Sequence, residues 1–268
     1  MKKILLLLSA VVNYAVLNAQ VKEGTITYEQ KVNMHRTIQD EQMKAMIPEF
    51  NTSKFLLYFS DSVSMYKPVP QDEAPDPFEG GGGRRIVFRF GTGGGDLYKN
   101  LAQAKSIQTS EIGGKNFLIV DSIKQSPWKL GTETRQILGY TCHKATRTIT
   151  MNSPGRRIIM AGNGSGEVTK DSTIAAPKGK EVEVVAWFAD DIISPVGPEN
   201  YGQLPGVILQ LDVDNGATVF NATEVKKTVD VKELKEPKKG KVVTRQEFTK
   251  MMSEMMSNMG PGGFRIGG

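Results

Sequence analysis

The chain has 268 residues and a formal net charge of +5, of which Lys2 and Lys3 contribute two. Its basic residues are spread along the chain, which excludes the clustered basic face of a nucleic-acid-binding protein. With one cysteine and two histidines, an internal disulfide is excluded, and a hydrolytic triad has few residues from which to form. We therefore expect a protein that is not an enzyme, needs no cofactor and has no nucleic-acid partner.

The N-terminus has the order of features that is typical of a secretory signal peptide. Lys2 and Lys3 form a basic start, residues 4–8 begin an apolar run, and Ala19 is a small residue at the expected cleavage point. Polar residues interrupt the apolar run, so we expect no transmembrane span in the mature chain. The mature protein is expected to begin at Gln20 and to be periplasmic or secreted.

The rest of the chain shows mainly the alternation of apolar and polar residues that predicts β-strands. The expected strands are 24–34, 54–59, 63–66, 85–90, 97–107, 117–120, 136–150, 157–160, 181–188, 207–213 and 217–231. One short helix is expected within 37–47, ended by Pro48. Segments 68–83 and 162–180 are rich in glycine and polar residues and are predicted to be loops.

Turn residues between these strands indicate the fold class. Asn215 and Gly216 supply the positive φ angles of a tight hairpin between strands 207–213 and 217–231. About ten short strands with few helices favour a mainly β protein, built as a single curved antiparallel sheet or half-open barrel. We expect one β-rich domain over residues 20–233, after a signal peptide at residues 1–19.

The C-terminal part changes to a helical period. We expect a basic linker at 234–243, an amphipathic helix at 244–260 and a glycine-rich tail at 261–268. Thr244 and Glu247 have the spacing of a capping box. The apolar residues that follow lie on one helical face, namely Phe248, Met251, Met252, Met255, Met256 and Met259.

Residues 197–211 read GPENYGQLPGVILQL and resemble the GLPGLI family of secreted Bacteroidetes proteins. The motif centre is Leu204, Pro205, Gly206, Val207 and Ile208. Further similar pieces occur in the same order as in the family, namely residues 114–117, 128–130, 139–146 and 187–188. The resemblance covers residues 22–231 and implies an exported β-rich protein with no assigned reaction and no catalytic residues.

The Leu-Pro-Gly centre itself predicts a turn that leads into a buried strand. Pro205 fixes its own φ and favours an extended Leu204, and Gly206 can adopt conformations closed to other residues. Gln203 stands where the family has glycine, and we expect that this position does not require a positive φ. The motif is interpreted as structural, and a ligand-binding lip built from the same loop is the alternative.

Five aromatic residues are the candidate ligand-binding set: Trp128, Tyr140, Trp187, Phe188 and Tyr201. Tryptophan and tyrosine combine a large apolar surface with a polar end, which suits a concave pocket as well as a core. By analogy of architecture with periplasmic lipid carriers, the expected function is a binding or carrier module for an apolar ligand, a lipid or an envelope partner.

The methionine-rich helix supports an alternative function. Met251, Met252, Met255, Met256 and Met259 share one helical face, and thioether sulfur is a soft ligand that selects Cu(I). A periplasmic Cu(I)-handling protein is therefore the second hypothesis. The same stripe also predicts packing against the sheet or a partner, because flexible methionine side chains fill irregular gaps.

Four remaining residues are not assigned to a site. Cys142 is expected to be a buried, inert thiol, with His143 on the opposite face of its strand. Asp190 and Asp191 follow a strand end, and we expect them to be solvated rather than to form a cation site.

Overall fold

The computed structural model describes residues 21–38, 40–70, 95–151 and 179–258. The predicted signal peptide, the strands at 85–90 and 157–160, most of the predicted loops, Met259 and the tail at 261–268 lie outside the described residues. In the described part, no helix is both long enough and apolar enough to cross a membrane.

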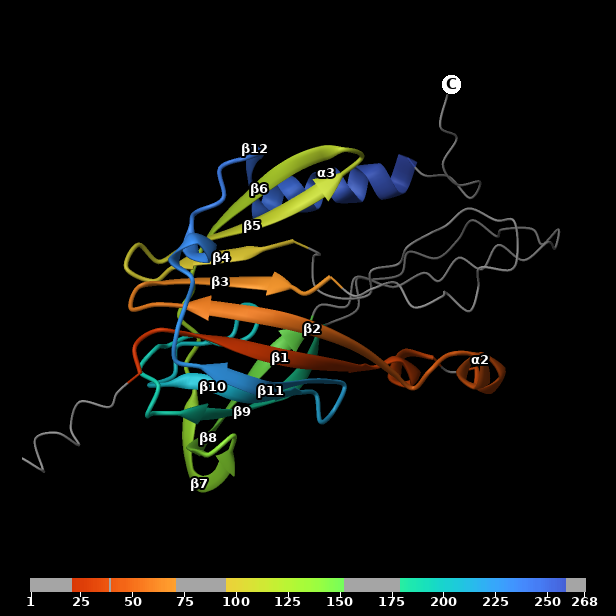
Figure 1. Ribbon diagram of the computed structural model, residues 1–268. Coiled ribbons are helices and arrows are strands. Elements are labelled where there is room, and N and C mark those ends of the chain that lie inside the picture. The colour runs from red at the N-terminus through yellow and green to blue at the C-terminus, as the bar shows by residue number, and fades with distance from the viewer. Residues whose placement is uncertain (1–20, 39, 71–94, 152–178, 259–268) are drawn as a thin grey trace, which may run out of the picture.

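The described residues form one open sheet of twelve strands, in the order β12-β6-β5-β4-β3-β2-β1-β11-β10-β9-β8-β7 (Figure 1). All neighbours pair antiparallel except β12, which runs parallel to β6. The mainly β fold that the sequence predicts is confirmed. The elements are β1 Gly24–Asn33, η1 Met34–Thr37, α2 Glu41–Met46, β2 Phe50–Phe59, β3 Val63–Pro68, β4 Leu97–Asn100, β5 Lys105–Ile112, β6 Lys115–Ser122, β7 Lys129–Ile137, β8 Tyr140–Met151, β9 Lys180–Ala189, β10 Val207–Val213, β11 Thr218–Lys226, η2 Val231–Leu234, β12 Lys241–Thr244 and α3 Arg245–Asn258.

The largest core lies between the sheet and the segment that joins β9 to β10. Ile26 and Tyr28 of β1 alternate with partly exposed residues and are fully buried. Ile192, Val196 and Leu204 of the connecting segment join the same cluster. This cluster takes side chains from both β1–β4 and β8–β11. The connecting segment therefore covers one face across most of the sheet.

Two smaller clusters complete the interior. Met65, Tyr98, Ile107 and Leu118 form one of them, with Leu234 of η2 packed against it. The other cluster lies at the β12 end of the sheet, where α3 runs alongside β5 and β6 (Figure 1). Its members are Phe117, Ile119 and Val243, with Ile112, Phe248 and Met251 packed against them.

Two long predicted strands are each divided by a turn. The predicted strand 97–107 is β4 and β5, because residues 101–104 form a turn in which Ala104 has φ 48°. The predicted strand 136–150 begins in β7 and continues in β8, because Leu138 (φ 51°) and Gly139 (φ 83°) form a two-residue hairpin turn. Leu138 stands where a two-residue turn usually has asparagine or aspartate, so the strand pattern continued through it. The turn after β4 is marked by Asn100, whose Oδ1 accepts from the Gln103 amide at 3.0 Å.

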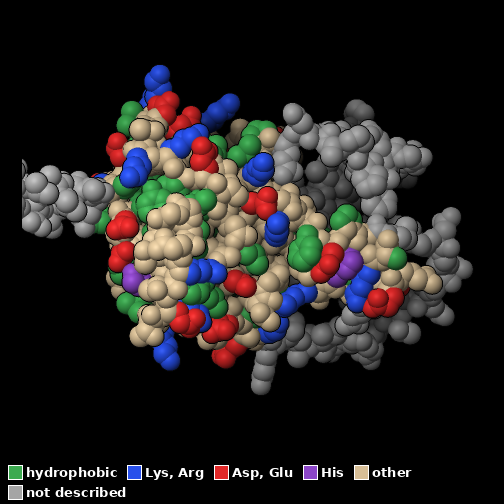
Figure 2. Space-filling model, turned by 60° about the horizontal axis from the view of Figure 1, so that its bottom comes forward, with side chains coloured by type: hydrophobic (Ala, Val, Ile, Leu, Met, Phe, Trp, Pro, Cys, Tyr) green, Lys and Arg blue, Asp and Glu red, His purple; other side chains and the backbone are tan. Residues whose placement is uncertain are grey.

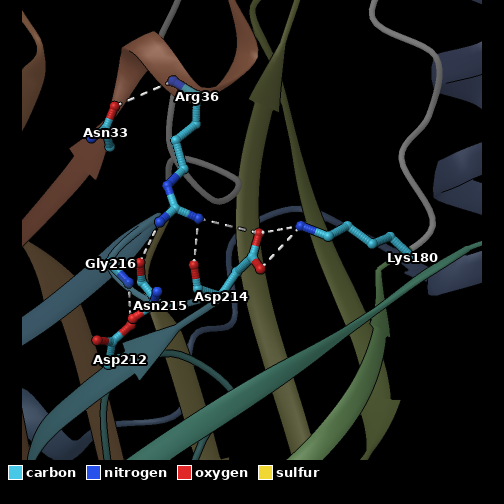
Figure 3. Close-up of polar contacts among 7 residues, drawn as sticks. All are labelled: Asn33, Arg36, Lys180, Asp212, Asp214, Asn215 and Gly216. Atoms are coloured by element: carbon cyan, nitrogen blue, oxygen red, sulfur yellow. Dashed lines mark hydrogen bonds and ion pairs between the residues drawn. The ribbon is translucent and has the colours of Figure 1, made fainter.

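The predicted turn after β10 is confirmed, with φ of 57°, 49° and 84° at Asp214, Asn215 and Gly216. Arg36, which follows β1, donates hydrogen bonds to the backbone carbonyls of Asp214 and Asn215 (Figure 3). Lys180 at the start of β9 pairs with the Asp214 carboxylate at 2.8 Å. Charged side chains from η1 and β9 thus hold this turn.

The C-terminal region differs from the sequence prediction in one respect. Residues 241–243, predicted to be linker, belong to β12 and pair with β6 from Phe117 to Ile119. The capping box is present as predicted. The Glu247 amide donates to Thr244 Oγ1 at 3.2 Å, and Glu247 Oε2 accepts from the Thr244 amide at 2.7 Å.

Candidate functional site

A buried lysine lies beneath the loop that precedes the Leu-Pro-Gly motif. Lys99 of β4 is only 4% exposed. Its ammonium donates to the backbone carbonyl of Glu199 at 2.6 Å and to that of Tyr201 at 3.4 Å. Glu199 is itself at φ 50° and accepts a hydrogen bond from Gln30. Side chains of β1 and β4 therefore hold this loop, whose backbone is strained at Glu199.

Burial sets the electrostatics of this region. It lowers the pKa of Lys99 to about 8, against the opposing effect of Glu199. It raises the pKa of Tyr66, which is also raised by the negative charge of Glu199. The Tyr66 hydroxyl has no hydrogen-bond partner in the described part of the protein. The lysine amine is enclosed and engaged with carbonyls, so we assign it a role in holding the loop.

The candidate aromatic residues Trp128 and Tyr201 meet around one arginine. The Arg147 guanidinium carbon lies 4.4 Å from the Trp128 ring centroid and 5.0 Å from that of Tyr201. The Trp128 indole N–H donates to the Gly202 carbonyl at 2.9 Å. Burial lowers the pKa of Arg147 and raises that of Tyr201 to about 12. These two aromatic residues therefore fasten the same loop to the strands beneath it.

The other three aromatic candidates have different neighbours. The Arg135 guanidinium carbon lies 3.9 Å from the Trp187 ring centroid. Phe188 is buried in the main core beside His143. Tyr140 is partly buried against the same core at the start of β8. Adjacent strand residues face opposite sides of a sheet. All five aromatic residues belong to or pack against the main core, and Trp128 and Tyr201 also share Arg147. A common ligand site for the five stays a prediction.

The Leu-Pro-Gly motif is tightly enclosed. Leu204, Val207 and Ile208 are buried, and a Cβ on Gly206 would lie 1.9 Å from the Ala189 carbonyl oxygen. The expectation for Gln203 is wrong, because its φ is 66°. Its side chain compensates by hydrogen bonding to the Ser126 amide and the Lys124 carbonyl, both at 2.9 Å.

The cysteine and the acidic pair lie in different environments, because Cys142 is buried and Asp190 and Asp191 are exposed. Burial raises the pKa of Cys142 to about 11. His143 Nε2 lies 3.3 Å from Asp190 Oδ2, and both side chains are partly exposed. In the ranges that the structure describes, no three His, Cys, Asp or Glu residues are grouped as metal ligands would be.

The methionines of α3 occupy different environments. Met251 packs against the Phe117–Ile119–Val243 cluster, and Met252 and Met255 are partly exposed. The Met256 side chain and Met259 are outside the described residues. Cu(I) binding by these methionines stays a prediction.

A hollow of about 510 Å³ opens beside α3, and sequence reasoning did not find it. We call it the α3 hollow. It is lined by Lys115, Asn116, Phe117, Lys239, Gly240, Lys241 and Met251. Gly240 permits the close passage of the chain, because a Cβ there would lie 3.0 Å from the Asn116 backbone. The hollow lies between the start of β6 and the segment that enters β12. These two segments are more than a hundred residues apart in sequence.

Comparisons with known proteins agree with this architecture. Residues 128–210 match a family described as "Protein of unknown function (Porph_ging)". The chain is similar in fold to two structures of PNGF-II, in the P21 and C2 space groups, each with a TM-score of 0.52 and 17% identity. Each match covers 87% of this chain and 34% or 33% of PNGF-II, so this chain spans about a third of that protein. No curated protein matches the sequence. The matches show a shared fold and, over residues 128–210, a similarity to a family described as of unknown function.

Proposed function

We propose that this chain is a non-enzymatic binding protein of the cell envelope, and that it holds an anionic amphiphile in the α3 hollow. The observation that carries the proposal is the combination of an apolar floor and a lysine rim in one hollow. The volume falls in the range of about 300–1,000 Å³ that is usual for small-molecule sites. The signal-like N-terminus and the GLPGLI resemblance support an exported binding protein.

The floor of the α3 hollow suits an alkyl chain. Phe117 is 6% exposed and Met251 is partly buried. Phe117 lies edge-on to Phe248 at 6.1 Å between ring centroids. Methionine side chains adapt to irregular apolar shapes, so Met251 can follow a flexible chain.

The rim of the hollow suits a carboxylate or phosphate. Lys115, Lys239 and Lys241 are all exposed. Within the described ranges, none of the three ammonium groups forms an ion pair. Hydrogen bonds from Thr244 lower the pKa of Glu247, and the positive charge of Lys241 also helps to lower it. Their positive charge is therefore available to a ligand head group, and their stems extend the apolar lining.

A binding measurement with matched ligands tests this proposal. The probes are dodecanoate, dodecyl phosphate, dodecyl maltoside and inorganic phosphate, titrated by calorimetry. We expect the two anionic amphiphiles to bind and the neutral detergent and free phosphate to bind more weakly, since each supplies half of the required chemistry. Equal affinity for dodecyl maltoside would contradict a role for the lysine rim, and tight binding of inorganic phosphate alone would indicate a plain anion site.

Charge-matched variants separate the rim from general electrostatic attraction. The test variant is K115Q/K239Q/K241Q, and the control is K22Q/K54Q/K227Q, whose three lysines are also exposed. Each surface ion pair contributes up to about 1 kcal/mol, so the test variant should bind dodecanoate about tenfold more weakly. The control should bind like the wild type. Equal losses in both variants would contradict the proposed site.

A further inference from the structure

Arg147 of β8 has two aromatic rings against its guanidinium but no acceptor for its N–H groups in the described part of the chain. The guanidinium carbon lies 4.4 Å from the Trp128 ring centroid and 5.0 Å from that of Tyr201. Its Nε is buried without a hydrogen-bond partner, whereas its two Nη atoms are not enclosed in this way. The aromatic contacts stabilise the positive charge but offer the N–H donors no oxygen or nitrogen acceptor.

The local structure fixes where this guanidinium lies. Lys129 pairs with Thr146 at the start of the β7–β8 ladder, and continuing this register by one residue places Trp128 opposite Arg147. The Trp128 indole is itself held by its hydrogen bond to the Gly202 carbonyl. The arginine is thus held between β7 and the β9–β10 connection before any ligand binds, so binding costs little side-chain entropy.

The neighbours of Arg147 leave its charge uncompensated. Burial raises the pKa of Tyr201 to about 12, so this phenol is neutral at neutral pH. The carboxylate of Glu199 in the same loop accepts a hydrogen bond from Gln30 of β1. It is not among the groups that affect the pKa of Arg147, which are burial and Tyr201. A partly buried charge attracts a counter-charge more strongly than an exposed one, because less water screens it.

A carboxylate matches this unpaired guanidinium. Arginine presents its N–H donors in a planar fork that pairs with two oxygens of one anion. A single cation favours a singly charged carboxylate, and the partly exposed rings of Trp128 and Tyr201 favour an acid with an aromatic body. Figure 2 turns the β7 end of the sheet toward the viewer and shows acidic and basic side chains interspersed there. Binding therefore depends on the local contacts rather than on a long-range field of one sign.

We propose that Arg147, Trp128 and Tyr201 form a binding site for the carboxylate of an aromatic organic acid, which we call the Arg147 site. Its three residues are not among those that line the α3 hollow, so binding at one site does not require binding at the other. Arg135 provides an internal comparison. It also stacks on an indole, that of Trp187, but it is exposed.

Titration of the full chain with benzoate, benzyl alcohol and inorganic phosphate tests the site. The chain has two tryptophans, so the variant W187F leaves Trp128 as the one fluorescent indole, and its emission reports the site. We expect benzoate to change this emission and to bind at least about tenfold more tightly than benzyl alcohol or phosphate. Benzyl alcohol that binds as well would show an apolar site, and phosphate that binds as well would show a plain anion site. Either result would overturn the proposal.

Arginine variants in the W187F background separate the site from general attraction. R147Q removes the charge and R147K keeps the charge but removes the planar fork, so each should bind benzoate at least about tenfold more weakly. R135Q removes an equal charge from an exposed position and should bind like its parent. The lysine-rim variant K115Q/K239Q/K241Q should also bind like its parent, which keeps this test separate from that of the α3 hollow. Equal losses in R147Q and R135Q would contradict the Arg147 site.

A measurement on the wild type does not depend on the folding of any Arg147 variant. In nitrogen-15 NMR spectra of the full chain, the Arg147 Nε–H resonance should shift on addition of benzoate and stay unchanged with benzyl alcohol. The Arg135 Nε–H resonance should move with neither probe. An Arg147 resonance that stays in place as benzoate is raised, or one that moves together with that of Arg135, would overturn the proposal.

Discussion

The region beneath the β9–β10 connection and the region around α3 have opposite construction. In the first, buried side chains and specific hydrogen bonds fix the loop: Lys99 and Trp128 donate to its backbone carbonyls, and Gln203 of the loop bonds to Ser126 through its side chain. In the second, a small cluster supports one helix, and a hollow with three exposed lysines remains beside it. The contrast teaches that the buried polar and charged groups hold the fold together, whereas the α3 hollow lies where packing is sparse.

The largest expected effect is that of Gly206→Ala. The new Cβ would lie 1.9 Å from the Ala189 carbonyl oxygen, which is backbone and cannot move aside. We expect the free energy of unfolding to fall by at least about 3 kcal/mol in urea denaturation. Gly113→Ala is the control, because nothing lies within 4 Å of its Cβ and only its φ of +56° is unfavourable. It should cost about 1 kcal/mol, and equal losses would show that the loop is not tightly enclosed.

Lys99→Met should have the next largest effect. It keeps the apolar stem and removes the donor to the Glu199 and Tyr201 carbonyls. We expect a loss of about 2 kcal/mol in the same assay, from two buried acceptors left without a donor. Lys54→Met, on an exposed residue of β2, should stay within about 0.5 kcal/mol of the wild type. A wild-type-like K99M protein would contradict the role given to this amine.

The same lysine gives a pH dependence whose sign is defined. Its pKa is about 8 in the folded protein and about 10.4 in an unfolded chain. Between these values the unfolded state binds more protons, so stability rises with pH in this window. The stability difference between wild type and K99M should therefore shift in favour of the wild type by about 2 kcal/mol from pH 8 to pH 10. A difference that is constant with pH would mean that Lys99 titrates normally.

Trp128→Phe tests a smaller part of the anchored region. The ring is largely retained, but the hydrogen bond to the Gly202 carbonyl is lost and the stacking on Arg147 is weakened. We expect a loss of about 1–2 kcal/mol. Trp187→Phe weakens only the stacking of Arg135 and should cost about 0.5 kcal/mol. If the two losses are equal, the indole hydrogen bond contributes nothing measurable.

The smallest global effect is expected from Thr244→Ala, at the other end of the sheet. It removes the side-chain half of the capping box of α3, which usually costs about 1 kcal/mol. Because α3 packs on a small cluster, the change should appear mainly as faster amide hydrogen exchange in α3. Amide hydrogen exchange in β1 should be unchanged. Slower exchange, or exchange that becomes equally faster throughout the chain, would contradict the separation of the two regions.

The sequence predicts the strands well because alternation along them is strong, as in β1, where Ile26 and Tyr28 are buried and Thr27 is not. It fails at the turn between β7 and β8, where Leu138 adopts a positive φ despite its bulk. The strand β12 was missed because four residues, with Val242 exposed and Val243 buried, are too short to give a period. The family resemblance located Gly206, but nothing in a single sequence indicates its distance from Ala189.

The candidate site was harder to predict than the fold. Trp187 and Phe188 were grouped by residue type, although neighbours in a strand cannot share a face. Lys115 and Lys239 meet only because β12 adds in parallel beside β6, a pairing between segments with no local signal. The same holds for Lys99, which resembles a surface residue until the loop that covers it is known.

The central position of β1 has a consequence for how the molecule is made. Thr25 pairs with Tyr58 on one side and with Lys226 on the other, so β1 can complete its pairing only after β11, far along the chain, has been synthesised. Such long-range pairing gives a high contact order and slow folding. During that interval one edge of β1 stays unpaired and is open to pairing with another chain.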